Sequence, residues 1–267
     1  MKQVQLAAGH TLAWREAGEG RPLVLVHGWS MSSAVFAELL PALGEEHLAL
    51  APDLRGHGSS EQADGYSLDD FASDLEEWLG LLGHADIDLL GWSLGGQVAL
   101  RLAHRGAVRV RRLTLVATPP RFVAAADWPH GLPDGQVRVM ARELRRAYLK
   151  TQGDFFLRQF AGEELSRERL REIRGFAVRC GALPSPEVAL AALETLRSGD
   201  LRSELSDLTC PVLVQQGGLD SITLPEAGAA LAAGCPQGRL VLQPGQGHAP
   251  FLSAPQASLA LWREFLA

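Results

Sequence analysis

Within this 267-residue chain, Asp88–Gly96 reads Asp-Leu-Leu-Gly-Trp-Ser-Leu-Gly-Gly and constrains the fold more than any other segment. Apolar residues suited to a buried strand lead into the pattern Gly-x-Ser-x-Gly, and a helical pattern follows. Such a strand–turn–helix lifts the hydroxyl of Ser93 above a sheet, while Gly91 and Gly95 leave room where a Cβ would meet neighbouring backbone. The helix also points its first amides toward negative charge that develops beside Ser93. The stretch therefore predicts a serine nucleophile.

The flanking segments alternate between strand and helix patterns. Ser67–Leu82 carries an apolar stripe at helical spacing, and Ser67 with Asp70 predicts a capping box at its start. A second helix is expected over Leu94–His104. This alternation predicts a mainly parallel sheet covered by helices on both faces. The apolar runs that predict its strands are Leu23–Val26, His47–Ala51, Ile87–Leu90, Leu113–Ala117, Val212–Gln216 and Arg239–Leu242.

The alternation is interrupted from about Pro119 to Leu205, where only helical patterns occur. We therefore expect residues 1–118 and 206–267 to form one α/β core, and residues 119–205 to form an inserted helical cap. Because open α/β sheets bind ligands at the carboxyl ends of their strands, the cap is expected to act as a lid. The helices are predicted over residues 136–150, 153–162, 166–180 and 186–198 in the cap, and over Gln256–Leu266 at the end of the core.

A nucleophilic serine needs a base, and the base needs an acid that orients it. After a Gly-x-Ser-x-Gly elbow the chain order is serine, acid, histidine. Of eight histidines, only His248 follows both the elbow and a late predicted strand, in a glycine-rich segment. Asp220 follows the preceding predicted strand and is preferred as the acid. Asp53 precedes Ser93 in the chain and is expected to stabilise a turn.

The oxyanion of an acyl-transfer intermediate needs two N–H donors. We expect them to be the backbone amide of Leu94 and that of Trp29, which lies in the loop after Val26. His27 in the same loop is expected to brace it. Solvated positions in turns or on helix surfaces are expected for His10, His47, His84, His104 and His130.

Composition excludes several classes of protein. Hydrophobic residues make up 46 % and charged residues 21 % of the chain, as in a folded globule. No apolar run approaches the roughly 18–20 residues of a membrane helix, and no signal-peptide pattern opens the chain. The three cysteines are widely spaced, and no Walker A or His-Glu-x-x-His motif occurs. We expect a cytoplasmic monomer with neither a cofactor nor a metal.

Positive charge is concentrated in the predicted cap. The net charge of −6 disfavours nucleic-acid binding, yet residues 121–180 carry a net +4 and the remainder a net −10. The cap therefore offers a basic surface on an acidic protein.

The chain resembles the α/β-hydrolase superfamily over essentially its whole length. Within it, the chain is similar to the BioH family, the pimeloyl-[acyl-carrier protein] methyl ester esterases of biotin synthesis. The elbow and the predicted triad are shared with many hydrolases, so the stretches in the cap discriminate better. The similar stretches are His27–Trp29, Gly91–Gly96, Asp127–Pro129, Ala182–Val188 and Gly247–Phe251.

The resemblance implies a serine carboxylesterase that removes the methyl group from a carrier-bound pimeloyl chain through an acyl-enzyme on Ser93. It also implies that Trp29, Leu94 and Phe160 line the substrate channel. Acyl-carrier proteins are acidic, and the family binds them with cap arginines. The corresponding arginines here are Arg158, Arg167, Arg171 and Arg174.

Other interpretations stay open. The last three of these arginines share a helical face, but the chain holds 23 Arg and 2 Lys, so the face could simply be solvated, with Glu168 and Glu172 pairing locally. The same fold would serve a general short-chain carboxylesterase, a lactonase or a carbon–carbon bond hydrolase, with a perhydrolase side activity also conceivable. A third class is a low-turnover, receptor-like ligand binder, against which the complete set of Ser93, Asp220 and His248 argues.

Overall fold

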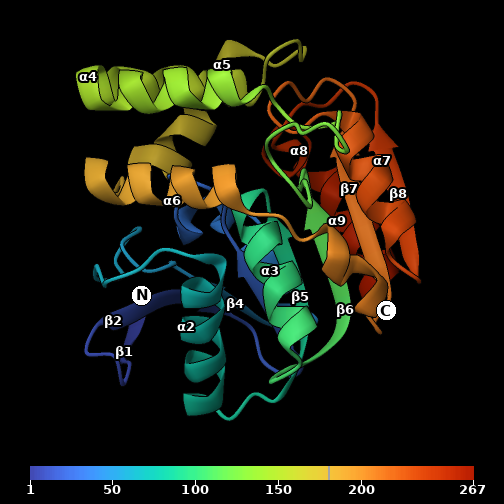
Figure 1. Cartoon of the computed structure of the whole chain (residues 1–267). Helices are drawn as coiled ribbons and strands as arrows, with labels where there is room; N and C mark the ends of the chain where they lie inside the picture. The colour runs from blue at the N-terminus through green and yellow to red at the C-terminus, as the bar shows by residue number, and fades with distance from the viewer. Residues whose placement is uncertain (180) are drawn as a thin grey trace.

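The computed structural model describes residues 1–179 and 181–267 and contains an eight-stranded sheet in the order β1-β2-β4-β3-β5-β6-β7-β8 (Figure 1). Strands β1 and β2 are antiparallel to each other, β2 is antiparallel to β4, and the other pairs are parallel. The mainly parallel sheet is therefore confirmed. The strands are β1 (Lys2–Gln5), β2 (Thr11–Ala17), β3 (Pro22–Val26), β4 (Leu48–Pro52), β5 (Asp86–Trp92), β6 (Arg109–Val116), β7 (Val212–Gly217) and β8 (Gly238–Gln243).

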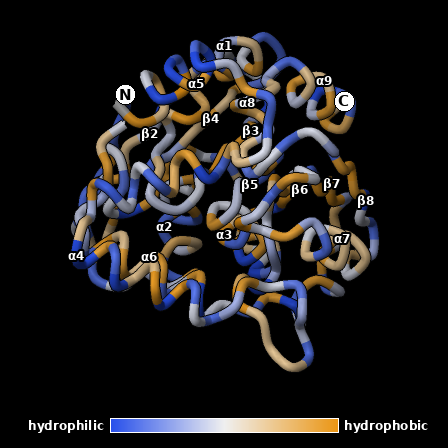
Figure 2. The backbone as a smooth tube through the Cα atoms, turned by 90° about the horizontal axis from the view of Figure 1, so that it is seen from above, coloured by the Kyte–Doolittle hydropathy of each residue, from blue (hydrophilic) through white to orange (hydrophobic). Residues whose placement is uncertain are grey.

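Helices cover both faces of this sheet, as Figure 2 shows from above, with α2, α3 and α7 on one side and α1, α8 and α9 on the other. The core helices and helical turns are η1 (Ser33–Phe36), α1 (Leu40–Leu43), α2 (Leu68–Leu81), α3 (Leu94–Arg105), η3 (Arg202–Asp207), α7 (Pro225–Gly234), α8 (Pro250–Ser253) and α9 (Pro255–Leu266). The predicted capping box is present: Asp70 N donates to Ser67 Oγ and Ser67 N to Asp70 Oδ2.

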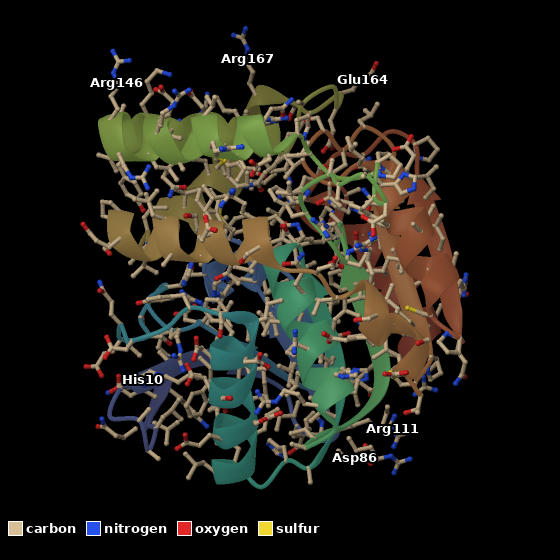
Figure 3. All side chains as sticks on the ribbon, viewed as in Figure 1. His10, Asp86, Arg111, Arg146, Glu164 and Arg167 are labelled. Carbon is tan, nitrogen blue, oxygen red and sulfur yellow. The ribbon has the colours of Figure 1, made fainter. Side chains whose placement is uncertain are left out.

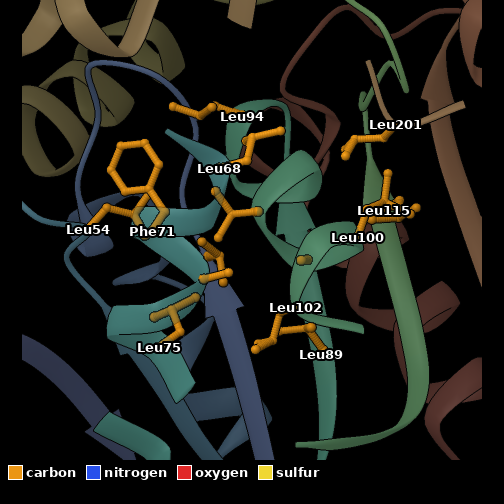
Figure 4. Close-up of a cluster of buried hydrophobic side chains, with 14 of the residues drawn as sticks. Leu54, Leu68, Phe71, Leu75, Leu89, Leu94, Leu100, Leu102, Leu115 and Leu201 are labelled. Atoms are coloured by element: carbon orange, nitrogen blue, oxygen red, sulfur yellow. The ribbon is translucent and has the colours of Figure 1, made fainter. Parts of the chain in front are cut away.

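Successive strand residues face opposite cores, because side chains alternate across a pleated sheet. Val24 and Leu89 face the α2–α3 side, whereas Leu23 and Leu90 face the α1–α9 side. Figure 4 shows part of the first core, where Phe71 and Leu75 of α2 and Leu100 of α3 meet the sheet. Burial of this kind contributes roughly 1.5–3 kcal/mol per large apolar side chain, and it fixes the sheet that carries the site.

The antiparallel pair β1–β2 is missing from the predicted strands. Strand β1 is mostly exposed and polar, so it lacks the continuous apolar run that identifies the central strands.

The histidine predictions also need correction. His10 and His47 are buried rather than solvated, and His10 Nε2 lies 3.0 Å from Asp74 Oδ2. Burial of a polar ring requires such a partner, and a partner 64 residues away leaves no local signal.

The helices of residues 119–205, called the cap here, lie above the carboxyl ends of the central strands (Figure 1). Helix α4 consists of two helical stretches that meet at a kink at Ala147, whose φ and ψ are −150° and 60°; two helices were predicted here, with the break at residues 151–152. Cys180, the last residue of the helix predicted over 166–180, lies outside the described residues. The cap contains α4 (Asp134–Arg158), α5 (Arg167–Ile173), the π-helical turn η2 (Arg174–Arg179) and α6 (Pro186–Ser198).

The two chain segments that connect the cap to the core are held together by an ionic cluster. Arg121 Nη1 lies 2.7 Å from Asp200 Oδ2, and Arg202 Nη2 lies 2.8 Å from Asp200 and 3.0 Å from Asp127. The hydrogen bonds from Arg202 lower the pKa of Asp200 to about 2. Arg202 also lies over the ring of Trp128. The cluster fixes where the cap begins and ends relative to the sheet.

No helix in the described part of the chain combines the length and the apolar character needed to cross a bilayer.

Candidate active site

Strand β5 passes directly into helix α3 at Ser93, whose backbone adopts φ 56° and ψ −116°. A non-glycine residue in this region is strained by about 1–3 kcal/mol, and such strain is typical of functional turns. Glycines make the turn possible. A Cβ on Gly91 would overlap the backbone of Gly95, and one on Gly95 would overlap the carbonyl oxygens of Val26 and His27. The close approach of strands and helix therefore fixes the Ser93 turn.

Gly95→Val is expected to impair folding rather than chemistry, because the new side chain would enter the backbone of the β3 loop. We expect a melting-temperature loss of several degrees or no soluble folded protein, the scale of a change that costs more than about 3 kcal/mol. Gly80→Ala is the control, since Gly80 lies within α2 with no atom near its Cβ position. A normally stable Gly95→Val protein would contradict this packing.

The structure brings Asp220 and His248 together: His248 Nδ1 lies 2.8 Å from Asp220 Oδ2, and both side chains are buried. Asp220 also accepts hydrogen bonds from the amides of Ile222 at 2.8 Å and Thr223 at 2.9 Å, and from Gln216 Nε2 at 3.2 Å. These donors hold the carboxylate in one orientation. Gln216 was not predicted as a site residue, because its contact with Asp220 depends on the fold of the turn after β7.

The other ring nitrogen of His248, Nε2, is buried and has no hydrogen-bond partner among the described residues. The ring lies 5.6 Å from that of Trp92, the residue before Ser93, and Trp92 Nε1 donates to the His248 carbonyl at 2.8 Å. A buried nitrogen normally finds a partner. The free Nε2 beside the elbow is thus available to take a proton during a reaction.

Asp53 has a different environment. Its two oxygens accept hydrogen bonds from the amides of Ser33 at 2.6 Å and Ser59 at 2.8 Å. These contacts agree with the predicted role in a turn and leave Asp220 as the carboxylate that contacts His248.

The loop after β3 lies against Ser93. A Cβ on Gly28 would come within 3.3 Å of the Ser93 Cβ. His27 braces this loop as predicted, because its Nδ1 bonds the Gly28 carbonyl at 2.9 Å while its Nε2 accepts from the amide of Leu54 at 3.0 Å. Burial lowers the pKa of His27 to about 4, so the ring is neutral near pH 7. The oxyanion roles of the Trp29 and Leu94 amides stay predictions.

The side chains of the same loop contact the cap. Trp29 Nε1 donates to the Ala189 carbonyl at 2.8 Å, and the Trp29 ring meets Phe155 edge-on at 4.8 Å. Gln152 Nε2 donates to Ser30 Oγ at 2.7 Å. The cap therefore holds the loop that flanks Ser93.

A cavity of about 490 Å³ opens among residues of the cap, and the core contributes Ile222 to its wall. It adjoins the site, because Phe155 also packs on Trp29 and the Ile222 amide binds Asp220. Phe160, predicted to line the substrate channel, is buried against Phe156 and is not part of this cavity wall. Phe155 lines this cavity, and only its aromatic character could have suggested it, while the role of Phe160 in a substrate channel stays a prediction. The apolar lining is Phe122, Leu132, Val137, Val139, Met140, Phe155 and Ile222, with Glu143, Lys150, Asp154 and Arg158 adding charge.

The four predicted docking arginines are all exposed, and they fall into two groups by their contacts. Arg158 Nη2 donates to the Ser221 carbonyl at 2.8 Å, next to the Asp220 turn. Arg167, Arg171 and Arg174 are exposed, and no ion pair involves them within residues 1–179 and 181–267. Glu172 pairs instead with Arg169, at 3.3 Å. Figure 3 shows Arg146 and Arg167 projecting from the cap away from the core.

Comparison with known proteins agrees with this geometry. A family described as the alpha/beta hydrolase fold matches residues 21–255. The chain belongs to the α/β-hydrolase family. A pimeloyl-[acyl-carrier protein] methyl ester esterase of Nitrosomonas europaea is 38 % identical over 239 residues, covering 90 % of this chain and 93 % of the relative. The protein of the same name from Nitrosospira multiformis is 34 % identical over 246 residues, covering 91 % and 93 %.

Among solved structures, an esterase from Exiguobacterium antarcticum superposes with a TM-score of 0.89 at 24 % identity, covering 99 % of this chain and 98 % of that one. At that identity the likeness supports the fold. With the relatives above, the family confirms the predicted class of enzyme, a carboxylic ester hydrolase.

Proposed function

We propose that this α/β-hydrolase is a serine carboxylesterase that hydrolyses the methyl ester of pimeloyl-[acyl-carrier protein], a step in biotin synthesis. The observation that carries the chemistry is the buried His248–Asp220 contact with a free Nε2 beside the Ser93 turn. The relatives, 38 % and 34 % identical over nine-tenths of this chain, support the substrate.

The reaction proceeds by acyl transfer. Ser93 Oγ attacks the ester carbonyl while His248 Nε2 takes the hydroxyl proton, and Asp220 stabilises the resulting imidazolium. The amides of Trp29 and Leu94 hold the oxyanion. Collapse of the intermediate releases methoxide, which leaves as methanol with the proton from His248. Water, deprotonated by His248, then attacks the acyl-enzyme, frees the carboxylate and restores the Ser93 hydroxyl.

The cavity of the cap suits the acyl chain. Its volume of about 490 Å³ falls within the range of small-molecule sites, roughly 300–1,000 Å³, and its walls are mainly apolar. An acyl chain that reaches Ser93 through this cavity would pass Phe155, which packs on Trp29, and Ile222, whose amide binds Asp220. Exposed Arg167, Arg171 and Arg174 lie on α5 and at the start of η2, where they offer positive charge to an acidic carrier protein.

An esterase for small free esters is the second candidate. Its support is the position of Arg158, which is bound to Ser221 beside the site instead of projecting to a partner. The same triad would also serve a lactonase or a carbon–carbon bond hydrolase, and only substrate comparison separates these activities.

Reversing two cap charges tests carrier docking. The double variant Arg171→Glu/Arg174→Glu is expected to lower kcat/KM for the carrier-bound ester about tenfold or more at low salt, because surface charges chiefly set the association rate. The effect should shrink as salt rises. Hydrolysis of free dimethyl pimelate should not change.

The matched control is Arg109→Glu/Arg111→Glu, which reverses two charges on β6; Figure 3 shows Arg111 at the end of the molecule opposite the cap. Equal kcat/KM for the carrier-bound ester in wild type and the cap variant would rule out docking through these arginines.

A further inference from the structure

The loop that carries His248 is held by the cap. In the turn after α4, the carbonyl of Gln159 accepts a hydrogen bond from the amide of His248 at 2.8 Å. Four residues later, Glu163 Oε1 accepts one from the amide of Gly247, also at 2.8 Å. Two successive amides of the loop therefore donate hydrogen bonds to one short segment of the cap.

The core holds the same loop from the other side. Trp92 Nε1 donates a hydrogen bond to the carbonyl of His248, and the amide of Leu219 donates one to the carbonyl of Gln246 at 2.8 Å. A Cβ on Gly217, at the end of β7, would overlap the carbonyl oxygen of Gly247. The loop thus lies between the end of the sheet and the cap. A displacement of either part would therefore move the His248 backbone.

Gly247 allows the cap to come this close. A Cβ at this position would lie 2.5 Å from the Gln159 carbonyl oxygen and 2.8 Å from Glu163 Oε1. Glu163 is half-buried, and a hydrogen bond from an amide to a carboxylate is roughly twice as strong as one between neutral groups. The contact is therefore close, partly shielded and charge-assisted.

We propose that Glu163 is a positioning residue for the catalytic histidine: by binding the Gly247 amide it fixes the Gln246–Gly247 peptide, one residue before His248, and so aims Nε2 at Ser93. Asp220 fixes the ring through Nδ1, but it does not fix the backbone from which the ring extends. Misplacement by about 1 Å can cost on the order of 100-fold in rate. The cap thereby serves catalysis as well as covering the site.

A second contact between cap and core makes the role of Glu163 separable from cap attachment. Arg169 on α5 donates to Glu38 Oε1 at 2.9 Å and to the carbonyl of Leu252 at 2.8 Å. Trp29 and Gln152 join the two parts elsewhere. Loss of the Glu163 carboxylate therefore leaves the cap attached while releasing one amide of the histidine loop.

The test compares Glu163→Met, which keeps the length of the side chain without an acceptor, with Glu163→Gln, which retains an oxygen at that place. We expect Glu163→Met to lower kcat for p-nitrophenyl acetate about 10- to 100-fold, with KM and melting temperature nearly unchanged. Glu163→Gln should recover kcat to within about threefold, since its amide oxygen accepts the same hydrogen bond. Glu164→Ala is the control, because Glu164 is exposed and points away from the core (Figure 3).

The inference rests on the proposed serine-hydrolase function but not on the carrier-bound substrate. Wild-type protein without Ser93-dependent turnover of p-nitrophenyl acetate would contradict the proposed function itself. With turnover present, three results would overturn the role of Glu163 alone. These are an unchanged kcat in Glu163→Met, equal impairment of Met and Gln variants, or failure of both to fold.

Discussion

Ser93→Ala is expected to lower ester hydrolysis on the order of 10⁶-fold, the loss seen when the serine of a catalytic triad is removed. The fold should persist, because alanine adopts a φ of 56° as readily as serine does. The Ser93 hydroxyl also makes no hydrogen bond within the described residues, so its removal breaks none. Melting temperatures within about 2 °C of each other would verify this, since one kcal/mol shifts a chain of this size by roughly 2–4 °C.

A fluorophosphonate probe gives an independent measurement of the same prediction. Labelling requires an activated hydroxyl, so wild-type protein should be labelled at Ser93 and Ser93→Ala should not. Wild-type protein that the probe does not label would contradict the assignment of Ser93 as the nucleophile and would favour a receptor-like binder. Labelling of Ser93→Ala would show that another residue reacts.

Asp220→Asn is expected to lower kcat about 10⁴-fold, as the corresponding change does in known Ser-His-Asp triads. Asp220 Oδ1 accepts hydrogen bonds from two backbone amides. Asparagine should therefore place its carbonyl oxygen at that position and turn its NH₂ group toward His248 Nδ1. A donor at that place holds the ring in the wrong tautomer and removes the charge that stabilises the imidazolium. KM should change little.

Asp207→Asn is the matched control, because its side chain is exposed and lies 3.8 Å from His104 on the surface. It should retain wild-type kcat. A loss below about tenfold in Asp220→Asn would assign the orientation of His248 to another carboxylate. Thermal unfolding of both variants keeps a folding defect from being mistaken for a catalytic one.

The elements that the sequence predicted well are those with a strong local pattern. The central strands are continuous apolar runs, and α2 begins at the predicted capping box at Ser67. The elbow at Ser93 was also predictable, because the glycines that its close packing needs stand in the sequence. Strand β1 was not, since an exposed edge strand carries few apolar residues.

Within the site, the residues that could be predicted are those whose chemistry needs a given residue type. Ser93, Asp220 and His248 fit the order that the mechanism demands, and the structure brings the last two into contact. Residues that act through tertiary packing gave no such signal. Glu163 meets Gly247 across 84 positions of the chain, and Phe155, which was not predicted, lines the cavity and packs on Trp29.

Contacts between distant segments also explain the misplaced histidines and the division among the arginines. His10 is buried because Asp74 lies beside it, and Arg158 is bound because the Asp220 turn presents the Ser221 carbonyl. Charge and helical spacing alone could not separate Arg158, which binds the Ser221 carbonyl, from Arg167 and Arg171, which make no ion pair within the described residues.

Methanol release from pimeloyl-[acyl-carrier protein] methyl ester, compared with hydrolysis of p-nitrophenyl esters of short acids, tests the proposed function most directly. Ser93→Ala supplies the blank for both reactions. We expect a kcat/KM for the carrier-bound ester far above that for the free esters. Equal or faster hydrolysis of the free esters would contradict it, and would make the protein a general carboxylesterase whose cap arginines are solvated surface.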